Sequence, residues 1–359
     1  GRRSKLPRKP ILPGSSTDVP WSLEGVLPCR RQLLLEKELN VLASLEEATL
    51  LAGRIGDFLR DFAARDLSGR LLTRLVSAFN DQLSRRVIEL TARRHRLPAS
   101  SWCWLALGSE GRHEQTFVSD QDNGLIFSAT DHHEADALRA LFLPFAQDVN
   151  RRLADCGFSL CSGGIMAGNP EWCLSQSEWK QRFVDWVRVP EPQALLNASI
   201  FFDLRPLYGD VDLGEGLRSH LLSLTVGATA FLHLMAANAL QAQVPLNFRG
   251  EVVAAGGVSG NQIDLKKFGS RIFVDAARIF ALACGARPVN TSARLSDSAP
   301  AAGLLGPELA AVDAAFSHIL RLRLSHQLAV GPAAVEAGQG IPLDSLHDVD
   351  KAILKEALR

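Results

Sequence analysis

The segment WCWLALGSEGRHEQTFVSDQDNGLIF, residues 102–127, decides the fold. Its two apolar runs, 102–107 and 125–127, are bounded by glycine and polar residues and predict two buried strands. Between them lies a polar loop that ends in two aspartates one residue apart, Asp120 and Asp122. Paired carboxylates repel each other and give a strand end no stability, so these two side chains indicate a binding role.

Gly108 and Ser109 follow the first predicted strand directly. A glycine lets the backbone approach a ligand closely, and the serine adds a hydroxyl and an amide donor. A turn of this kind after a strand can present several N–H groups to a phosphate. It is not a Walker A loop, because no Gly-Lys-Ser/Thr sequence follows it.

In an extended segment, residues i and i+2 point to the same face, so Asp120 and Asp122 are expected to project together. Without a cation the two carboxylates would repel, and one of them would tend to take up a proton. Carboxylate oxygens suit Mg²⁺, or Mn²⁺ in its place, with substrate phosphates and water completing the coordination shell. The alternative is that residues 119–124 form only a polar turn with side-chain-to-backbone hydrogen bonds.

The composition is that of a globular protein, with 359 residues, 47% hydrophobic and 22% charged. This length predicts roughly two or three folding units. With 39 basic and 39 acidic residues there is no overall basic footprint, so we expect no nucleic-acid partner. The six cysteines contain no C-x-x-C pair, which favours a reducing, cytoplasmic location.

Two segments could instead indicate a targeting signal or a membrane span. Residues 1–28 are rich in Pro, Gly and Ser, begin with a basic cluster that no apolar h-region follows, and predict a linker or disordered tail. Residues 221–240 contain no charged side chain and are about as long as a membrane span. Their Ser, Thr, His and Asn residues favour a core helix over a membrane span, so we expect no membrane partner.

The hydrophobic periodicity predicts an α+β fold that is mostly helical. Residues 29–98 carry apolar side chains at three-to-four spacing, which predicts an N-terminal helical hairpin broken near 66–69 and stopped by Pro98. Residues 99–213 predict a central α/β module with a small sheet. Its strands are expected at 102–107, 125–127, 158–165 and 198–204, and its helices at 134–153 and 178–187.

Residues 214–359 return to a helical pattern and predict a C-terminal helical domain. Its clearest helix spans 263–285 and ends at Gly285, a natural C-terminal cap. Further helices are expected at 307–328 and 343–358, and loops at 294–306 and 330–341.

The order of strand, Gly-Ser turn, loop, Asp-x-Asp and second strand resembles the signature of the polymerase-β-type nucleotidyltransferase superfamily. More closely, LGSEGRHEQTFVSDQDN (107–123) resembles the nucleotidyltransferase domain of bacterial signalling proteins that usually also carry cyclic-nucleotide-binding and CBS modules. That domain is related to the PII uridylyltransferase. The segments GIMAGNPEWCLSQSEW (164–179), FFDLRPLYGD (201–210) and IDLKKFGSRIFVDAARIFALACG (263–285) look like later blocks of the family. The last of them lies in its C-terminal substrate-binding domain.

The resemblance implies a role for each matching residue. Gly108 and Ser109 would contact the β- and γ-phosphates of a nucleotide, while Asp120 and Asp122 would hold Mg²⁺. Superfamily members carry a third catalytic carboxylate on a later strand, and Asp203 is the best candidate.

The residues themselves give Asp203 two interpretations. An aspartate inside an apolar strand is costly unless it is paired or metal-bound, which agrees with a third metal ligand. Arg205 lies on the same face of the predicted strand, so the alternative is a structural pair of Asp203 with Arg205 or with the backbone.

The remaining members of the predicted nucleotide-binding set are Arg112, Glu114, Arg205 and Lys266. Arg112 could clamp a phosphate, and Glu114 could orient Arg112 or a metal-bound water, with a plain surface position as the alternative for both. Lys266 begins a predicted helix, where the dipole disfavours a lysine, so either an anion lies nearby or the helix face is solvated.

The resemblance implies a Mg²⁺-dependent nucleotidyltransferase. The enzyme would transfer a nucleoside monophosphate from UTP or ATP to a hydroxyl acceptor and release pyrophosphate, with a PII-like regulatory protein as a candidate acceptor. Two alternatives stay open: a Mg-nucleotide sensor without turnover, and a helical interaction protein with an inert α/β centre.

Overall fold

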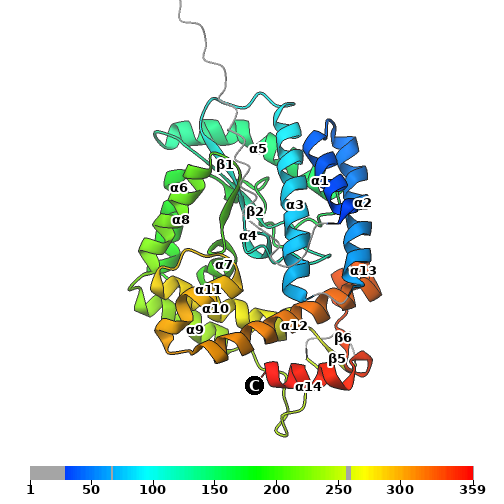
Figure 1. The fold of residues 1–359 in the computed structure, drawn as a ribbon. Helices are drawn as coiled ribbons and strands as arrows, with labels where there is room; N and C mark the ends of the chain where they lie inside the picture. Colours follow the sequence, from blue (N-terminus) through cyan, green and yellow to red (C-terminus); the bar gives the residue numbers. More distant parts are fainter. Residues whose placement is uncertain (1–28, 66–67, 256–259, 359) are drawn as a thin grey trace, which may run out of the picture.

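The computed structural model describes residues 29–65, 68–255 and 260–358 (Figure 1). It has the mostly helical α+β fold that the periodicity predicts, with a small sheet among the helices. The predicted linker, residues 1–28, lies outside the described residues.

The central sheet has four strands in the order β3-β2-β1-β4. They are β1 (Trp102–Ala106), β2 (Asn123–Phe127), β3 (Cys173–Ser175) and β4 (Arg205–Gly209). Strand β1 pairs antiparallel with both β2 and β4, whereas β2 and β3 are parallel. The first two strands confirm the predictions at 102–107 and 125–127.

Helices cover both faces of this sheet, namely α3 (Gly69–Ala92), α5 (His132–Asp155), α6 (Gln176–Arg188) and α8 (Val211–Thr225). Successive side chains of a strand point to opposite faces. Trp104 therefore packs into the core formed with α3 and α5, whereas Leu105 packs into the core formed with α6 and α8. Since both faces are buried, β1 is apolar throughout and easy to recognise in the sequence.

One end of the sheet gathers the polar segments that the sequence singles out. Strand β1 ends where its antiparallel neighbours β2 and β4 begin, so Gly108, Asp122 and Asp203 come to the same end of the sheet. The Leu107 N–H donates to the Asp122 carbonyl oxygen at 2.9 Å, which ties the first two segments together. The topology brings these residues together although they are far apart in the chain.

The N-terminal region contains three helices where the sequence predicts two. The two that precede α3 are α1 (Arg30–Val41) and α2 (Leu45–Ala63). Ser44 and Glu47 form a capping box that starts α2, and this local signal breaks the apolar pattern that the prediction treats as one helix. The side chains of α1, α2 and α3 share one core with β1, β2 and α5, so these helices brace the sheet.

Two of the four predicted strands are wrong. Residues 158–165 form turns with a single bridge, at Ser159. Residues 198–204 lie mainly in helix α7 (Pro192–Phe201), and β4 begins just after them. Short apolar runs do not distinguish a buried strand from a buried helix. Pro206 also conceals β4, which lies at the sheet edge, where a proline is tolerated.

The C-terminal part is helical, as predicted. Its helices are α9 (Thr229–Leu240), α10 (Arg271–Cys284), α11 (Thr291–Ser298), α12 (Gly306–Val330), α13 (Pro332–Glu336) and α14 (Asp348–Ala357). Two short strands, β5 (Gln262–Ile263) and β6 (Ile341–Pro342), pair with each other. Short 3-10 helices lie at Pro170–Trp172, Ala299–Ala302 and Leu343–Ser345.

The C-terminal predictions hold in part. Helices α12 and α14 confirm the expected helices at 307–328 and 343–358. The expected loops at 294–306 and 330–341 are wrong, because they contain parts of α11 and all of α13. The helix expected at 263–285 is α-helical only from Arg271, after a π-helical turn at Lys266–Ser270, and Gly285 ends it in the left-handed region with φ 67°.

The uncharged segment 221–240 spans the end of α8 and all of α9, which meet at a bend of 94°. Among the described residues no single helix is long and apolar enough to cross a membrane, although this bent pair reaches that length and composition together. Leu221 and Phe231 are buried in the core that the sheet shares with α6.

Gly69, at the start of α3, touches α12 backbone to backbone. A Cβ at this position would lie 2.3 Å from the Arg321 nitrogen and the Ser317 oxygen. We therefore expect Gly69→Ala to lower the free energy of unfolding by about 1–3 kcal/mol, because the two helices must separate. Denaturant unfolding measures this change.

The matched control is Gly53→Ala, on the open face of α2, where an added Cβ meets nothing within 4 Å. Alanine has the higher helix propensity, so this variant should gain roughly 0.5–1 kcal/mol. Equal effects of the two substitutions would contradict a tight contact between α3 and α12.

Candidate active site

The Gly-Ser turn lies against the second aspartate of the Asp-x-Asp pair. Gly108 starts the short helix α4 (Gly108–Gly111) with φ +53°, in the left-handed region that favours glycine. A Cβ on Gly108 would lie 2.8 Å from Asp122 Oδ2. The turn therefore needs glycine both for its backbone conformation and for the space that the carboxylate occupies.

The side chains of residues 120–123 alternate in direction: Asp120 and Asp122 line a cleft, whereas Gln121 and Asn123 are buried. Between them, the Gln121 side chain donates to the Asn150 and Phe158 carbonyl oxygens, both at 3.0 Å. The Asn150 amide in turn donates to Asn123 Oδ1 at 3.0 Å. Gln121, Asn123 and Asn150 are buried, so this amide network fixes the loop from the inside. These three residues are not among the predicted site residues, although the polar alternation D-Q-D-N at 120–123 is a signal for two of them.

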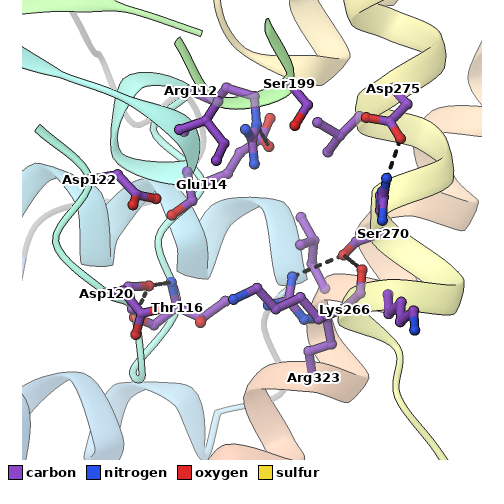
Figure 2. A pocket seen from close by; sticks show the side chains of 18 of the residues that line it. Arg112, Glu114, Thr116, Asp120, Asp122, Ser199, Lys266, Ser270, Asp275 and Arg323 are labelled. Atoms are coloured by element: carbon purple, nitrogen blue, oxygen red, sulfur yellow. Dashed lines mark hydrogen bonds and ion pairs between the residues drawn. The ribbon is translucent and has the colours of Figure 1, made fainter. Parts of the chain in front are cut away.

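The two aspartates line a cleft of about 330 Å³ between the α/β module and the C-terminal helices. From the first part come Gly108, Ser109, Arg112, Glu114, Thr116, Asp120 and Asp122, and from the second Asp264, Lys266, Ser270, Asp275, Arg278 and Arg323. Figure 2 shows Asp120 and Asp122 on one side of the cleft, with Lys266, Ser270 and Arg323 across from them. The structure thus brings most of the predicted site residues together.

The charges around Asp122 favour a bound cation. The pKa of Asp122 is raised to about 6, mainly by burial and also by the neighbouring Asp120 carboxylate, while the Cys161 thiol, Lys266 and Arg112 act in the opposite direction. A carboxyl that holds its proton this tightly is poorly solvated and lies next to another negative charge. A divalent cation would relieve both costs.

The donor set fits Mg²⁺ bound with its substrate. Among the described residues, no group of three or more His, Cys, Asp or Glu side chains is placed to hold a metal ion. Asp120 and Asp122 would supply two carboxylates and leave the other positions open. Mg²⁺ commonly binds in this way, through one or two carboxylates, several waters and substrate phosphate oxygens.

Asp203 lies outside the cleft lining and is fully buried. It accepts from Arg112 Nη1 at 2.6 Å, from Arg278 Nη2 at 2.6 Å and Nε at 3.0 Å, and from Arg294 Nη1 at 2.5 Å. Burial would raise the pKa of Asp203, but these three guanidinium groups hold it well below its usual range. Both carboxylate oxygens are thus occupied.

Two expectations about Asp203 need correction. It lies between α7 and β4 rather than within a strand, and its oxygens hold arginines, which argues against a third metal ligand. Arg205 is not its partner, because Arg205 Nη2 donates to Asp81 Oδ1 at 2.6 Å and to the Glu110 carbonyl oxygen at 3.0 Å. The bonds of Asp203 reach side chains up to 91 residues away, which no local pattern reveals.

Arg112 and Glu114 are parts of the same network rather than surface residues. Arg112 Nε donates to Glu114 Oε2 at 2.8 Å, and Glu114 Oε1 accepts from the Thr291 N–H at 2.7 Å and the Asn290 amide at 3.2 Å. Both side chains also line the cleft. Glu114 therefore orients Arg112, which connects the cleft wall to Asp203.

Two protein-family models match the chain, one on each side of the cleft. The family model described as "Putative nucleotidyltransferase DUF294" matches residues 53–193, which contain the Gly-Ser turn and both aspartates. The model described as "Putative nucleotidyltransferase substrate binding domain" matches residues 229–359, which contain Lys266 and Arg323. No curated protein matches the chain.

The buried network predicts a structural role for Asp203. We expect Asp203→Asn to lower the free energy of unfolding by about 3–5 kcal/mol, because three buried guanidinium groups lose a shared counter-charge. Thermal and denaturant unfolding measure the loss. The control is Asp61→Asn, which breaks an exposed ion pair with Arg31 and should cost at most about 1 kcal/mol. A stable Asp203→Asn protein that has lost only Mg²⁺ affinity would contradict this role.

The raised pKa of Asp122 predicts a pH-dependent stability. The pKa of Asp122 is about 6 in the folded protein and 3.8 ordinarily. The contribution of the protonated Asp122 carboxyl to the stability of the fold is therefore full below pH 3.8 and is lost as the pH rises through 6. At pH 8, Asp122→Asn should therefore raise the free energy of unfolding by roughly 1–3 kcal/mol. At pH 4 the gain should be smaller. Unfolding curves of both proteins at the two pH values, without divalent cations, measure the difference, and an equal gain at both would contradict the titration.

Proposed function

The chain belongs to the nucleotidyltransferase family whose two models match it, and from that premise we propose a Mg²⁺-dependent nucleotidyl transfer. The enzyme would transfer a nucleoside monophosphate from UTP or ATP to a hydroxyl acceptor and release pyrophosphate. The observation that carries the proposal is the contact between the Gly-Ser turn and the Asp-x-Asp pair, in which a Gly108 Cβ would approach Asp122 Oδ2 to 2.8 Å. A phosphate-binding turn and a pair of metal-binding carboxylates on one wall suit a metal-bound triphosphate.

In this proposal, different residues bind the phosphates and the metal. The Gly108–Gly111 turn and the Ser109 hydroxyl bind phosphate oxygens, and Asp120 and Asp122 hold Mg²⁺. When bound, the metal supplies charge neutralisation for the triphosphate and a lower pKa for the acceptor hydroxyl. Asp122, with a pKa of about 6, is ionised at neutral pH and ready to ligate. Most of the catalysis is then positioning and charge stabilisation.

Asp203 contributes through Arg112. The Asp203 carboxylate and Glu114 hold the Arg112 guanidinium at the cleft wall, at 2.6 and 2.8 Å. A guanidinium fixed in this way does not need to be ordered when the phosphate arrives, which reduces the entropic cost of binding. We therefore assign Asp203 a positioning role and leave the metal to Asp120 and Asp122.

A second cavity, of about 590 Å³, offers a place for the acceptor. It shares Asp120, Lys266 and Arg323 with the first cleft and extends toward Ser159 and Gly340. An acceptor hydroxyl that enters through this cavity would meet the metal site from the side of Asp120. A hydroxyl side chain on a PII-like protein is the acceptor that the family resemblance suggests.

A Mg-nucleotide sensor is the second candidate. The observation in its favour is that Asp203, the expected third carboxylate, is held by three arginines, which leaves Asp120 and Asp122 for the metal. Binding a metal–nucleotide complex requires fewer carboxylates than turnover in the related superfamily. Turnover therefore has to be measured separately from binding.

The first test is calorimetric titration of ATP, UTP, GTP and CTP, with and without Mg²⁺, against the wild type and the double variant Asp120→Asn/Asp122→Asn. We expect one triphosphate to bind in a Mg²⁺-dependent way and the double variant to bind it at least about tenfold more weakly, since it lacks both metal ligands. Asp61→Asn, far from the cleft on α2, is the control. No binding of any triphosphate by the wild type would overturn the proposal.

Pyrophosphate release separates the two candidates. The nucleotide that binds is incubated with Mg²⁺ and a purified PII-like protein, and the release of pyrophosphate and the mass of the acceptor are recorded. Release that stops in the double variant supports the transferase. Tight Mg²⁺-dependent binding without release favours the sensor.

A further inference from the structure

The cleft has a cationic side that the Asp-x-Asp pair does not explain. We propose that Arg323 and Lys266, both from the C-terminal part, bind the phosphate tail of the nucleotide, so that the triphosphate is held between the two parts of the chain. This inference rests on the proposed function and names the residues that recognise the triphosphate. The ligand class is a metal-bound polyphosphate.

Arg323, which is half-buried, differs from the arginines of the Asp203 cluster. Arg112, Arg278 and Arg294 each form an ion pair with Asp203. Among the described residues, by contrast, no carboxylate forms an ion pair with Arg323, and its guanidinium makes one hydrogen bond, from Nη1 to Ser270 Oγ at 3.0 Å. Its side chain lines the cleft (Figure 2), and no other hydrogen bond of its guanidinium to the described residues is found.

This arrangement is costly without a ligand. Burial lowers the pKa of Arg323 to about 10, so the side chain remains charged at neutral pH in a poorly solvated place. A charge that has lost part of its hydration is normally paired, because the protein replaces that hydration only through a partner. An anion in the cleft would supply the missing partner.

Lys266 provides a second cation on the same side. It lies at the start of the π-helical turn, and its backbone N–H donates to Asp264 Oδ1 at 2.8 Å, which fixes the position of the residue. Among the described residues its ammonium forms no ion pair within 4.0 Å. Its side chain lines the same cleft as Asp122.

The two sides together match a metal–polyphosphate complex. Asp120 and Asp122 offer anionic oxygens to a cation, and Arg323 and Lys266 offer N–H donors to phosphate oxygens that the cation leaves free. A guanidinium binds two phosphate oxygens at once, and an ammonium adds a point charge. Arg323 also lines both cavities, so it stands where the nucleotide and acceptor spaces meet.

The inference predicts an affinity that depends on the number of phosphates. Dissociation constants are measured in Mg²⁺ for the triphosphate, diphosphate and monophosphate of the nucleotide that binds, and for inorganic tripolyphosphate. For Arg323→Gln we expect triphosphate affinity to fall roughly tenfold or more, since charge-assisted hydrogen bonds are lost, with little change for the monophosphate. Lys266→Gln, an exposed position, should show the same trend more weakly.

The matched control is Arg321→Gln on the same helix, α12. Arg321 pairs with Asp350 at 2.6 Å and does not line either cavity. This variant should bind all four ligands as the wild type does. Arg323→Lys keeps the charge and should recover part of the triphosphate affinity. Should Arg323→Gln fail to fold, Lys266→Gln and Arg323→Lys carry the same test.

Each outcome decides between the two proposals. Unchanged triphosphate affinity in Arg323→Gln and Lys266→Gln, or an equal loss for monophosphate and triphosphate, would overturn the inference and leave the proposed function standing. Binding of tripolyphosphate that depends on Arg323, in a protein that binds no nucleoside triphosphate, would overturn the proposed function and support the anion site.

Discussion

The contact of Asp203 with three arginines is the interaction on which the site depends. It joins four segments: the turn after β1 through Arg112, the start of β4, and helices α10 and α11 through Arg278 and Arg294. The backbone is equally close, because a Cβ on Gly111 would lie 1.7 Å from the Asp203 carbonyl oxygen. Since the cluster contacts both walls of the cleft, it fixes the distance between them.

The chain uses arginine in two physically different ways around this cluster. Glu114, Asp275 and Asp203 neutralise Arg112, Arg278 and Arg294, so the charges within the cluster balance and removal of one partner would leave an unpaired charge. Across the cleft, Arg323 and Lys266 form no ion pair with a carboxylate of the described residues. They lie opposite Asp120 and Asp122, whose carboxylates repel each other. Positive and negative side chains therefore lie on opposite sides of the cleft, although basic and acidic residues are equal in number over the whole chain.

The sequence predicts the local part of this structure well and the distant part poorly. The Gly-Ser turn and the Asp-x-Asp pair are recognisable because spacing of one or two residues determines their geometry. The sequence pattern predicts Asp203 and Arg205 on one strand face, but Asp203 bonds Arg278, 75 residues away, and Arg205 bonds Asp81, 124 residues away. No local pattern marks Arg278, Arg294 or Arg323, because they lie in a predicted helix or loop, where an arginine is ordinarily exposed. Strand β3, three residues long, is too short for any periodicity.

The long sequence separation within the Asp203 cluster has a consequence for how the protein is made. Arg112 and Asp203 are synthesised well before Arg278 and Arg294, and α12 follows later still. Contacts between such distant segments form late in folding, because the intervening chain must first be ordered. A nascent chain that ends before α10 would hold an aspartate without two of its counter-ions and a cleft without its second wall. Completion of the cleft thus waits until α12 has left the ribosome.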